Sequence, residues 1–288
     1  MNQRLIILWA FLLLMVPVHA QFEWPSLSPK TTLTHIIGFT EVSISYERPA
    51  ARGRKIFGGL VPWNKVWRTG AGYCTKMSFS QPIILGGQKV EAGTYSLFTI
   101  PNPDHWVVIL NADTQLYGAY DYEAAKDVVR FSVIPRPAPH FYESLSFDID
   151  FVPNNAEIYL SWCDIQLSFS LETMTDQKVM QYIDEQLLTG LVTEPDDYAM
   201  AADYLVFQQG DMKKALRLAD LGIERGGGGF PYRVKVDILA DLGRIPEAIR
   251  TAEKALSLVP TYQNRSEEQK EGEVESWEKY LKELRQKK

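Results

Sequence analysis

The sequence has few of the residues from which metal sites and disulfide frameworks are built. It contains 4 histidines and 2 cysteines in 288 residues. After residue 20 the histidines are His35, His105 and His140, and none lies within metal-ligand spacing of another histidine or of a cysteine. A metal site assembled from residues on distant strands would not be visible as a short-range spacing. We therefore expect no metal and no cofactor, and a core held by apolar packing.

Sequence motifs of the common enzyme classes are also missing. The chain has no G-x-S-x-G elbow, no H-E-x-x-H pair and no P-loop. Gly70-Ala71-Gly72 is only a fragment of a dinucleotide-binding fingerprint, because Thr75 stands where the third glycine belongs. An excess of positive charge is missing as well, since the formal net charge is -6. This acidity argues against a nucleic-acid partner, which usually requires a basic face.

Long apolar runs are confined to the start of the chain. Arg4 precedes an unbroken apolar run, Leu5 to Val16, and Val18-His19-Ala20 follows as a small-x-small cleavage site. The run is too short to span a bilayer, which needs about 20 residues. We expect residues 1–20 to be a signal peptide cleaved before Gln21, and a secreted, periplasmic or cell-surface protein without a transmembrane segment. A retained N-terminal anchor is the alternative.

Export would place Cys74 and Cys163 in an oxidising compartment. Both cysteines fall in predicted strands, so a disulfide between them could join two strands and stabilise the fold by roughly 2–4 kcal/mol. Two separate buried thiols are the alternative, because a free cysteine packs as a small hydrophobic residue. The sequence leaves both alternatives open.

Apolar residues alternate with polar ones at a period of two from about residue 32 to residue 172, which indicates strands with one buried face. Gly86-Gly87 separates two short runs and predicts a hairpin turn. We expect nine or ten strands without intervening helices, which favours an antiparallel β-sandwich or jelly-roll-like domain over residues 21–174. The predicted strands include Val42–Tyr46, Tyr73–Phe79, Tyr95–Ile100, Trp106–Asn111, Val128–Ile134, Leu145–Phe151, Glu157–Trp162 and Ile165–Leu171.

The period becomes helical near Thr175 and stays so to the end of the chain, so residues 175–288 form a second predicted domain. Gly210 and Gly243 are 33 residues apart, and each is followed by alanines at the same two spacings, Ala215 with Ala219 and Ala248 with Ala252. Small residues at these spacings let helices approach closely, and the pattern resembles tetratricopeptide (TPR) repeats. The resemblance is weaker in the first unit, where glycines replace an expected alanine and proline.

The final helix is predicted to begin with a capping box, Ser266 and Gln269, and to cover the repeat with one apolar stripe. Two repeat units are fewer than such arrays usually need. We therefore expect the helical part either to dock on the β domain or to use a helix at Gln177–Leu188 as a third layer.

Basic and aromatic residues gather in the non-strand segment between Arg48 and Thr69. Guanidinium groups bind carboxylates or phosphates through paired hydrogen bonds, and aromatic rings offer flat faces for sugars. The segment therefore predicts a site for an anionic small ligand, peptide or glycan. The structural alternative is that the arginines bond carbonyls and the tryptophans fill the core. The candidate residues here are Tyr46, Arg48, Arg54, Trp67 and Arg68.

A second cluster, Tyr117-Gly118-Ala119-Tyr120-Asp121-Tyr122, places three tyrosines and one aspartate within six residues. Tyr120 and Asp121 could line a pocket, with Asp121 as a general base if its carboxylate were desolvated. A turn with stacked tyrosines is the structural alternative.

Seven longer motifs stand out in the first part of the chain, namely Tyr46–Pro49, Gly53–Pro62, Val66–Ala71, Ala92–Pro101, Trp106–Asn111, Gly118–Tyr122 and Asp127–Arg130. Together they resemble a bacterial family known as domain of unknown function 2911. The resemblance covers roughly residues 25–172 and implies a secreted β-sandwich-like domain without an established activity. The chain departs from the usual family pattern after Ala71, where Gly72-Tyr73-Cys74 replaces Asn-Glu-Ala.

Two functions compete on this evidence. The first is an exported cell-envelope binding protein, whose β domain holds an anionic ligand and whose helical repeat contacts a protein partner. The second is a hydrolase or lyase acting on an acidic sugar or peptide, with Arg68 holding the substrate and Asp121 or Tyr120 transferring a proton. The enzyme requires the two clusters to meet in one pocket.

Overall fold

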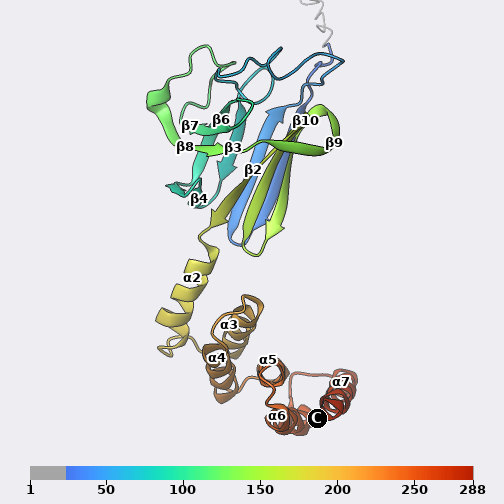
Figure 1. Ribbon diagram of the computed structural model, residues 1–288. Coiled ribbons are helices and arrows are strands. Elements are labelled where there is room, and N and C mark those ends of the chain that lie inside the picture. Colours follow the sequence, from blue (N-terminus) through green and yellow to red (C-terminus); the bar gives the residue numbers. More distant parts are fainter. Residues whose placement is uncertain (1–23, 288) are drawn as a thin grey trace, which may run out of the picture.

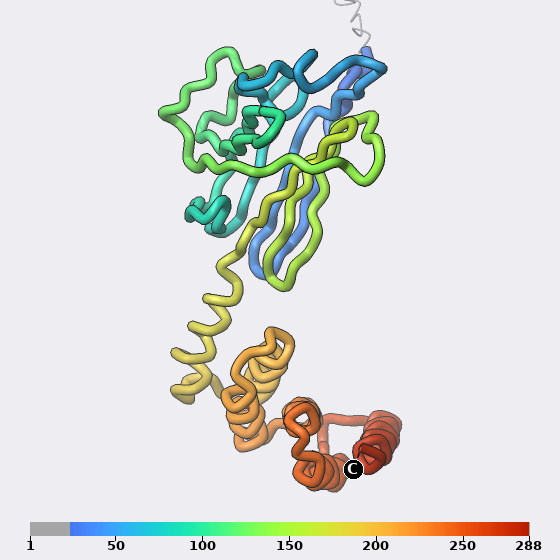
Figure 2. The backbone as a smooth tube through the Cα atoms, in the orientation of Figure 1, coloured from blue at the N-terminus to red at the C-terminus, as the bar shows by residue number. Residues whose placement is uncertain are grey.

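The computed structural model describes residues 24–287, so the predicted signal peptide lies outside the described residues. Within these residues, ten strands come first and six α-helices follow, which gives an α+β architecture. The strands form one body and the helices a second, joined through the first helix after the sheet (Figures 1 and 2). Within residues 24–287, no helix is both long and apolar enough to cross a membrane.

Two antiparallel sheets make up the β domain. The larger has the strand order β1-β2-β3-β6-β7-β8, and the smaller has the order β5-β4-β10-β9. The strands of the larger sheet are β1 (Lys30–Ile37), β2 (Thr40–Glu47), β3 (Thr75–Phe79), β6 (Gly93–Ile100), β7 (Trp106–Asn111) and β8 (Asp127–Val133). Those of the smaller sheet are β4 (Ile83–Leu85), β5 (Gln88–Val90), β9 (Arg136–Val152) and β10 (Asn155–Thr173).

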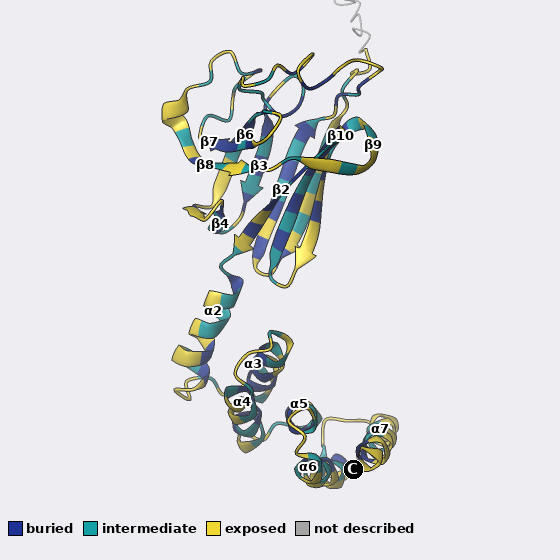
Figure 3. Cartoon of the chain, viewed as in Figure 1, coloured by how far each residue is buried: buried dark blue, intermediate teal, exposed yellow. Residues whose placement is uncertain are grey.

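The alternation seen in the sequence becomes the two faces of these strands. Along β2 the residues Val42, Ile44 and Tyr46 are buried, and the residues between them are more exposed (Figure 3). Gly86 and Gly87 both have positive φ values, 57° and 74°, as a tight hairpin turn requires. The predicted hairpin between β4 and β5 is therefore confirmed.

Residues from both sheets enter one hydrophobic cluster, so the sheets enclose a shared core. Several aromatic rings contact one another in this core. Trp67 stacks on Trp162 with ring centroids 5.8 Å apart, and Phe57 meets Trp106 edge-on at 4.9 Å. A smaller cluster around Cys74, Phe98 and Ile109 includes residues of the segment that joins β7 to β8.

The strand predictions need two corrections. β1 is not among the predicted strands. One of its faces is exposed and the other is mostly only half-buried, so the two faces of Lys30–Ile37 differ little in burial. The predicted strands Glu157–Trp162 and Ile165–Leu171 are one strand, β10, interrupted by an irregularity at Cys163, where φ is 55°. A bulge shifts the alternation of core-facing and solvent-facing residues without ending the strand. In the sequence, such a shift looks like the boundary between two strands.

The helical part begins directly after the sheet, since β10 ends at Thr173 and α2 begins at Thr175. The helix α2 (Thr175–Tyr182) continues as a π-helical turn, Ile183–Leu187. The other helices are α3 (Pro195–Phe207), α4 (Met212–Glu224), α5 (Gly229–Asp241), α6 (Ile245–Leu258) and α7 (Glu267–Gln286). Single 3-10 turns occur at Ala124–Lys126 and Val259–Thr261.

Small residues lie between the helices, as the sequence predicted. Ala215, Ala219, Ala248 and Ala252 are all fully buried. The predicted third layer is also confirmed, because Ile183 and Leu187 pack in one cluster with α3 and α4. The final helix α7 begins with the predicted capping box, and it buries Trp277, Leu281 and Leu284.

A polar cluster holds the helices to the β domain. Asn154 lies in the turn between β9 and β10, and its Nδ2 donates to Asp176 of α2 at 2.6 Å and to Tyr204 of α3 at 2.7 Å. The Tyr204 hydroxyl donates to the same Asp176 carboxylate. One hairpin tip and two helices are thus joined by three side chains.

Candidate functional site

The segment from Arg48 to Thr69 is fastened to the β domain by its first arginines. Arg48 donates from Nε to the Leu145 carbonyl at 3.0 Å and from Nη2 to Ser146 Oγ at 2.8 Å. Arg52 donates from Nη2 to the Leu27 carbonyl at 2.9 Å. Hydrogen bonds of this kind fix the path of a long loop, so these two guanidinium groups already have partners within the chain.

Two further candidates also have partners inside the fold. Arg54 donates from Nε to the Ala51 carbonyl at 3.0 Å and from Nη2 to the Ala50 carbonyl at 2.7 Å. Tyr46 is buried, and its hydroxyl accepts the Phe147 amide at 3.1 Å. Both arrangements match the structural alternative that the sequence left open.

Trp67 is partly buried and packs against the core. Its ring lies among the aromatic residues between the sheets, and its Nε1 donates to the Gly70 carbonyl at 3.2 Å. Its backbone exchanges two hydrogen bonds with Thr99, at 2.7 and 2.9 Å, in an isolated bridge. Because side chains alternate along an extended segment, the neighbour of Trp67 points to the opposite side.

That neighbour, Arg68, differs from the other three arginines of the segment. Its side chain makes no hydrogen bond or ion pair with another residue in 24–287, and its Nε is buried without a hydrogen-bond partner. Its guanidinium carbon lies 6.0 Å from the centre of the Tyr117 ring. A Cβ placed on Gly118 would lie 3.1 Å from Arg68 Nη1 and 2.8 Å from the Tyr120 ring. The two sequence clusters therefore meet at Gly118.

Glycine is required at this meeting point. Gly118 has a φ of 74°, and its amide donates to the Gly72 carbonyl at 3.1 Å. Its carbonyl accepts the Cys74 thiol at 3.0 Å. A larger residue would strain the backbone and displace Arg68 or Tyr120. The close approach of the two clusters thus depends on the absence of a side chain here.

Cys74 is a structural thiol at this site. Burial raises its pKa to about 11, although the nearby charge of Arg68 acts in the opposite direction. The thiol therefore stays protonated at neutral pH, and a protonated thiol is a poor nucleophile. Cys163 lies in the main core cluster, whereas Cys74 lies in the smaller one. Both cysteines are free and buried in the structure, in the arrangement of two separate thiols.

A cavity of about 300 Å³ is lined by Tyr73 and Cys74, and Arg68 is not among its lining residues. Tyr73 forms one of its walls and meets the Tyr117 ring edge-on, with centroids 5.2 Å apart. The other lining residues include two lysines, one glutamate and one glutamine, namely Lys30, Lys76, Glu47 and Gln115. Residues Tyr73 and Cys74, where the chain departs from the usual family pattern, both line this cavity. Guanidinium, ammonium and tyrosine groups together are suited to holding an acidic compound.

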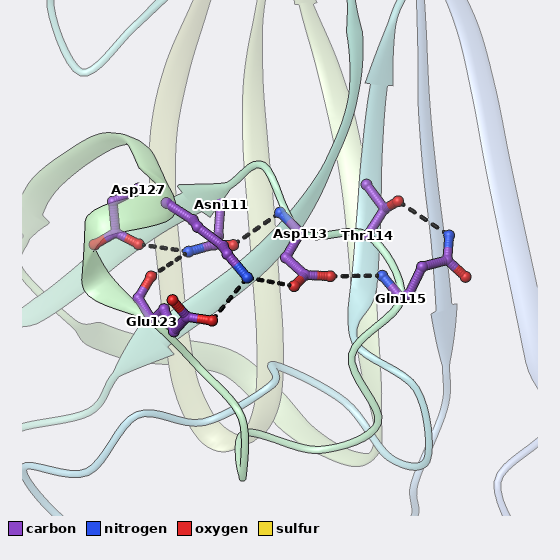
Figure 4. Close-up of polar contacts among 7 residues, drawn as sticks. Asn111, Asp113, Thr114, Gln115, Glu123 and Asp127 are labelled. Carbon is purple, nitrogen blue, oxygen red and sulfur yellow. Dashed lines mark hydrogen bonds and ion pairs between the residues drawn. The ribbon is translucent and has the colours of Figure 1, made fainter.

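The loop that carries Tyr117 and Tyr120 is held by a buried asparagine. Asn111 donates from Nδ2 to the Glu123 carbonyl at 3.0 Å and to Asp127 Oδ1 at 2.9 Å, and its Oδ1 accepts the Asp113 amide at 2.9 Å (Figure 4). The Asp113 carboxylate accepts the Gln115 amide at 3.1 Å. This network begins at the end of β7 and closes at the start of β8, so it fixes the loop against the sheet.

The network gives a structural role to residues of two family-like motifs, Trp106–Asn111 and Asp127–Arg130. Asp127 also accepts the Tyr122 hydroxyl at 2.7 Å and pairs with Arg130 at 2.8 Å. Burial and the hydrogen bond to Asp127 raise the pKa of Tyr122 to about 12. Sequence reasoning gave Asn111 and Asp127 no role, and their presence in the family-like motifs was the only available signal.

Tyr120 and Asp121 are both exposed, and Tyr120 is 85% accessible. Neither side chain donates or accepts a hydrogen bond to another residue in the described part of the chain. Tyr120 lies beside Gly118 and therefore near Arg68. A general base needs a desolvated carboxylate, and an exposed aspartate does not provide one.

The comparison with protein families identifies the β domain. The family model described as "Protein of unknown function (DUF2911)" matches residues 28–171, which is half of the chain. The chain belongs to this family, and the predicted resemblance is confirmed. No curated protein and no solved structure was found to match the chain. Among residues 24–287, no group of three or more histidine, cysteine or acidic side chains could hold a metal ion.

Proposed function

We propose that this chain is an exported binding protein of the cell envelope, whose β domain holds an anionic group of a peptide or glycan at Arg68. One observation carries the proposal. The guanidinium groups of Arg48, Arg52 and Arg54 bond atoms of the chain itself, whereas Arg68 has no such partner among the described residues. A part-buried guanidinium without a partner is costly to maintain unless an external acceptor uses it.

The surroundings of Arg68 favour an acidic ligand with a flat or extended body. Lys30 and Lys76 line the neighbouring cavity and add positive charge, against one carboxylate from Glu47. Exposed tyrosine rings at 117 and 120 offer surfaces on which a sugar ring or a peptide unit can pack. The exposure of Asp121 favours binding over proton transfer, so catalysis is not part of the proposal.

The helical part supports a role in contacting a protein. Its alanines recur at the TPR-like spacing and let the helices pack closely, and such stacked pairs form a groove. A cavity of about 290 Å³ lies among α4, α5 and α6. Arg250 and Lys254 line it, and their side chains make no hydrogen bond or ion pair with another described residue. We infer that a protein segment with acidic residues occupies this groove.

Export is proposed from the sequence of the first twenty residues. The test is the mass of the protein recovered from a bacterial host that secretes it. A chain that begins at Gln21 in the periplasm or medium supports export, and a full-length chain retained in the cytoplasm contradicts it.

The anion site is tested by calorimetric titration of residues 21–288 at low ionic strength. Three acidic probes cover the proposed chemistry: inorganic phosphate, tetraglutamate and digalacturonate. We expect at least one to bind, and we expect Arg68→Lys to weaken that binding at least tenfold, because an ammonium group cannot form the paired hydrogen bonds.

Arg52→Lys is the matched control. Arg52 belongs to the same segment and carries the same charge, but it donates to the Leu27 carbonyl. It should leave the affinity unchanged. Equal losses in both variants would mean that only overall charge matters, and the site at Arg68 would then be wrong. The proposal also fails if none of the three probes binds.

A further inference from the structure

A separate cavity of about 430 Å³ lies between the first half of the long loop and strands β9 and β10. It shares no lining residue with the cavity at Tyr73 and Cys74. Its walls are mainly apolar and aromatic, and its volume is in the range of small-molecule sites. The residues used below are Arg54, Lys55, Phe57, Trp63, Phe141 and Asp164, all of which line it.

The cavity lies at an irregularity in the sheet, because Cys163 and Ile165 line it. Ser161 pairs with Ser146, but Cys163 pairs with Tyr142, so β9 uses four residues where β10 uses two. The next pairing, Ile165 with Pro137, is shifted again. The additional residues of β9 leave the regular ladder, and Phe141 is one of them. Bulges of this kind often adjoin binding sites, because they redirect side chains away from the sheet.

One wall is a fixed aromatic surface. The ring of Trp63 is stacked on that of Phe57, with centroids 6.1 Å apart and planes inclined by 26°. Phe57 is in turn held edge-on by Trp106 and Trp162 of the main core. Gly58 has a φ of 73°, and a Cβ there would lie 2.3 Å from Trp63 Nε1. The indole therefore keeps its place because residue 58 has no side chain.

A second aromatic ring, that of Phe141, also lines the cavity. Phe141 is 62% exposed, although it is a large apolar side chain. A cavity bounded by a fixed indole and an exposed phenyl ring would gain from taking up a flat apolar body between them. Burial of such a body also removes the exposed apolar area of Phe141 from water.

The rim of the cavity carries more positive than negative charge. Lys55 and Arg54 line it together with one acidic residue, Asp164. The Lys55 ammonium makes no hydrogen bond or ion pair with another residue in 24–287. Arg54 uses Nε and Nη2 for carbonyls of its own loop, and its charge remains. The rim is therefore complementary to one carboxylate attached to an apolar body.

We propose that this cavity is a second ligand site, specific for a small planar apolar acid, with its ring between Trp63 and Phe141 and its carboxylate at Lys55. The site is independent of the anion site at Arg68. It differs in chemistry, since most of its affinity would come from ring contacts and apolar burial.

The test uses 2-naphthoate as the probe and residues 21–288 as the protein, with binding measured by calorimetry. We expect 2-naphthoate to bind in the micromolar to low millimolar range. The neutral analogue 2-naphthalenemethanol should bind at least fivefold more weakly, because it cannot pair with an ammonium group. Acetate, which has the carboxylate without the ring, should show no binding.

Two variants locate the site. Phe141→Ser should weaken 2-naphthoate binding at least fivefold, and the exposure of this residue makes the change safe for the core. Lys55→Met should weaken 2-naphthoate binding at least fivefold and leave 2-naphthalenemethanol binding unchanged. Lys65→Met is the matched control, because Lys65 belongs to the same loop but does not line the cavity.

The proposal is overturned if 2-naphthoate does not bind, if it binds equally well to both variants, or if the neutral alcohol binds as tightly as the acid. Arg68→Met should leave 2-naphthoate binding unchanged. If this variant abolishes 2-naphthoate binding while Phe141→Ser does not, the probe occupies the Arg68 site instead, and the second site is wrong. Loss of acidic-probe binding at Arg68 alone would not affect this site.

Discussion

Replacing Arg54 by methionine should lower the free energy of unfolding, whereas replacing Arg68 by methionine should leave it unchanged or raise it. Methionine keeps an unbranched apolar chain of similar shape and removes the guanidinium group. Arg54 donates two hydrogen bonds to carbonyls of its loop, at 3.0 and 2.7 Å. Arg68 donates none to a described residue, and its Nε is buried without a partner. The two variants therefore separate an arginine that supports the fold from one that is available to a ligand.

The expected magnitudes follow from these contacts. Arg54→Met loses two charge-assisted hydrogen bonds at a largely exposed side chain, where water competes, so it should cost about 1–2 kcal/mol. Arg68→Met removes a buried donor whose lack of a partner costs roughly 1–3 kcal/mol. It also loses the contact with the Tyr117 ring, which contributes about 0.5–1 kcal/mol. The Arg68 variant should therefore be as stable as the parent, or more stable by up to about 2.5 kcal/mol.

The assay is urea unfolding followed by tryptophan fluorescence, since Trp67, Trp106 and Trp162 report on the β core. The parent and both variants are compared at one pH and salt concentration. A loss of more than about 1 kcal/mol in Arg68→Met would refute the reasoning, because it would mean that Arg68 supports the fold. An unchanged Arg54→Met would show that its two hydrogen bonds contribute nothing.

Three more predictions concern the buried groups of the β domain. Both Cys74 and Cys163 should be alkylated in urea without reductant, and reductant should not lower the melting temperature; a pair of cysteines protected from alkylation would contradict the free thiols. Because burial raises the pKa of Cys74 from 9.0 to about 11, the unfolded chain loses this proton at lower pH than the folded protein. The free energy of unfolding should have its full value below pH 9 and fall by on the order of 1–2 kcal/mol towards pH 11, and Cys74→Ala should flatten this slope; an equal slope in the variant would contradict the assignment. Asn111→Leu should cost about 2–4 kcal/mol in urea unfolding, because it leaves the Asp113 amide and the Glu123 carbonyl without partners, and a neutral result would show that Asn111 does not hold the loop.

Much of the fold could be predicted because its signals are local. β7 begins and ends at the predicted residues, Trp106 and Asn111, and the hairpin at Gly86-Gly87 follows from the need for two positive φ values. The capping box of α7 was recognisable from Ser266 and Gln269 alone. Period, turn and cap signals of this kind depend on residues within a few positions of each other.

The site was harder to predict because it depends on contacts across the sequence. Nothing local distinguishes Arg68 from Arg48, yet Arg48 donates to a carbonyl at residue 145 and the Arg68 side chain has no hydrogen-bond partner in the described chain. The meeting of Arg68 and Tyr120 likewise depends on Gly118 lying against a residue 50 positions earlier in the chain. The cavity at Phe141 depends on a register shift that no single-sequence pattern encodes.

The central claim is that the Arg68 guanidinium is available to an external anion while those of Arg48 and Arg54 are not. Nitrogen–proton NMR spectra of the arginine side chains, recorded while inorganic phosphate or tetraglutamate is added, test this most directly. We predict that the Arg68 Nε–H signal shifts progressively, and that the Nε–H signals of Arg48 and Arg54 stay in place because they are bonded to carbonyls. A fixed Arg68 signal at saturating probe, or movement confined to Arg48 and Arg54, would contradict the claim.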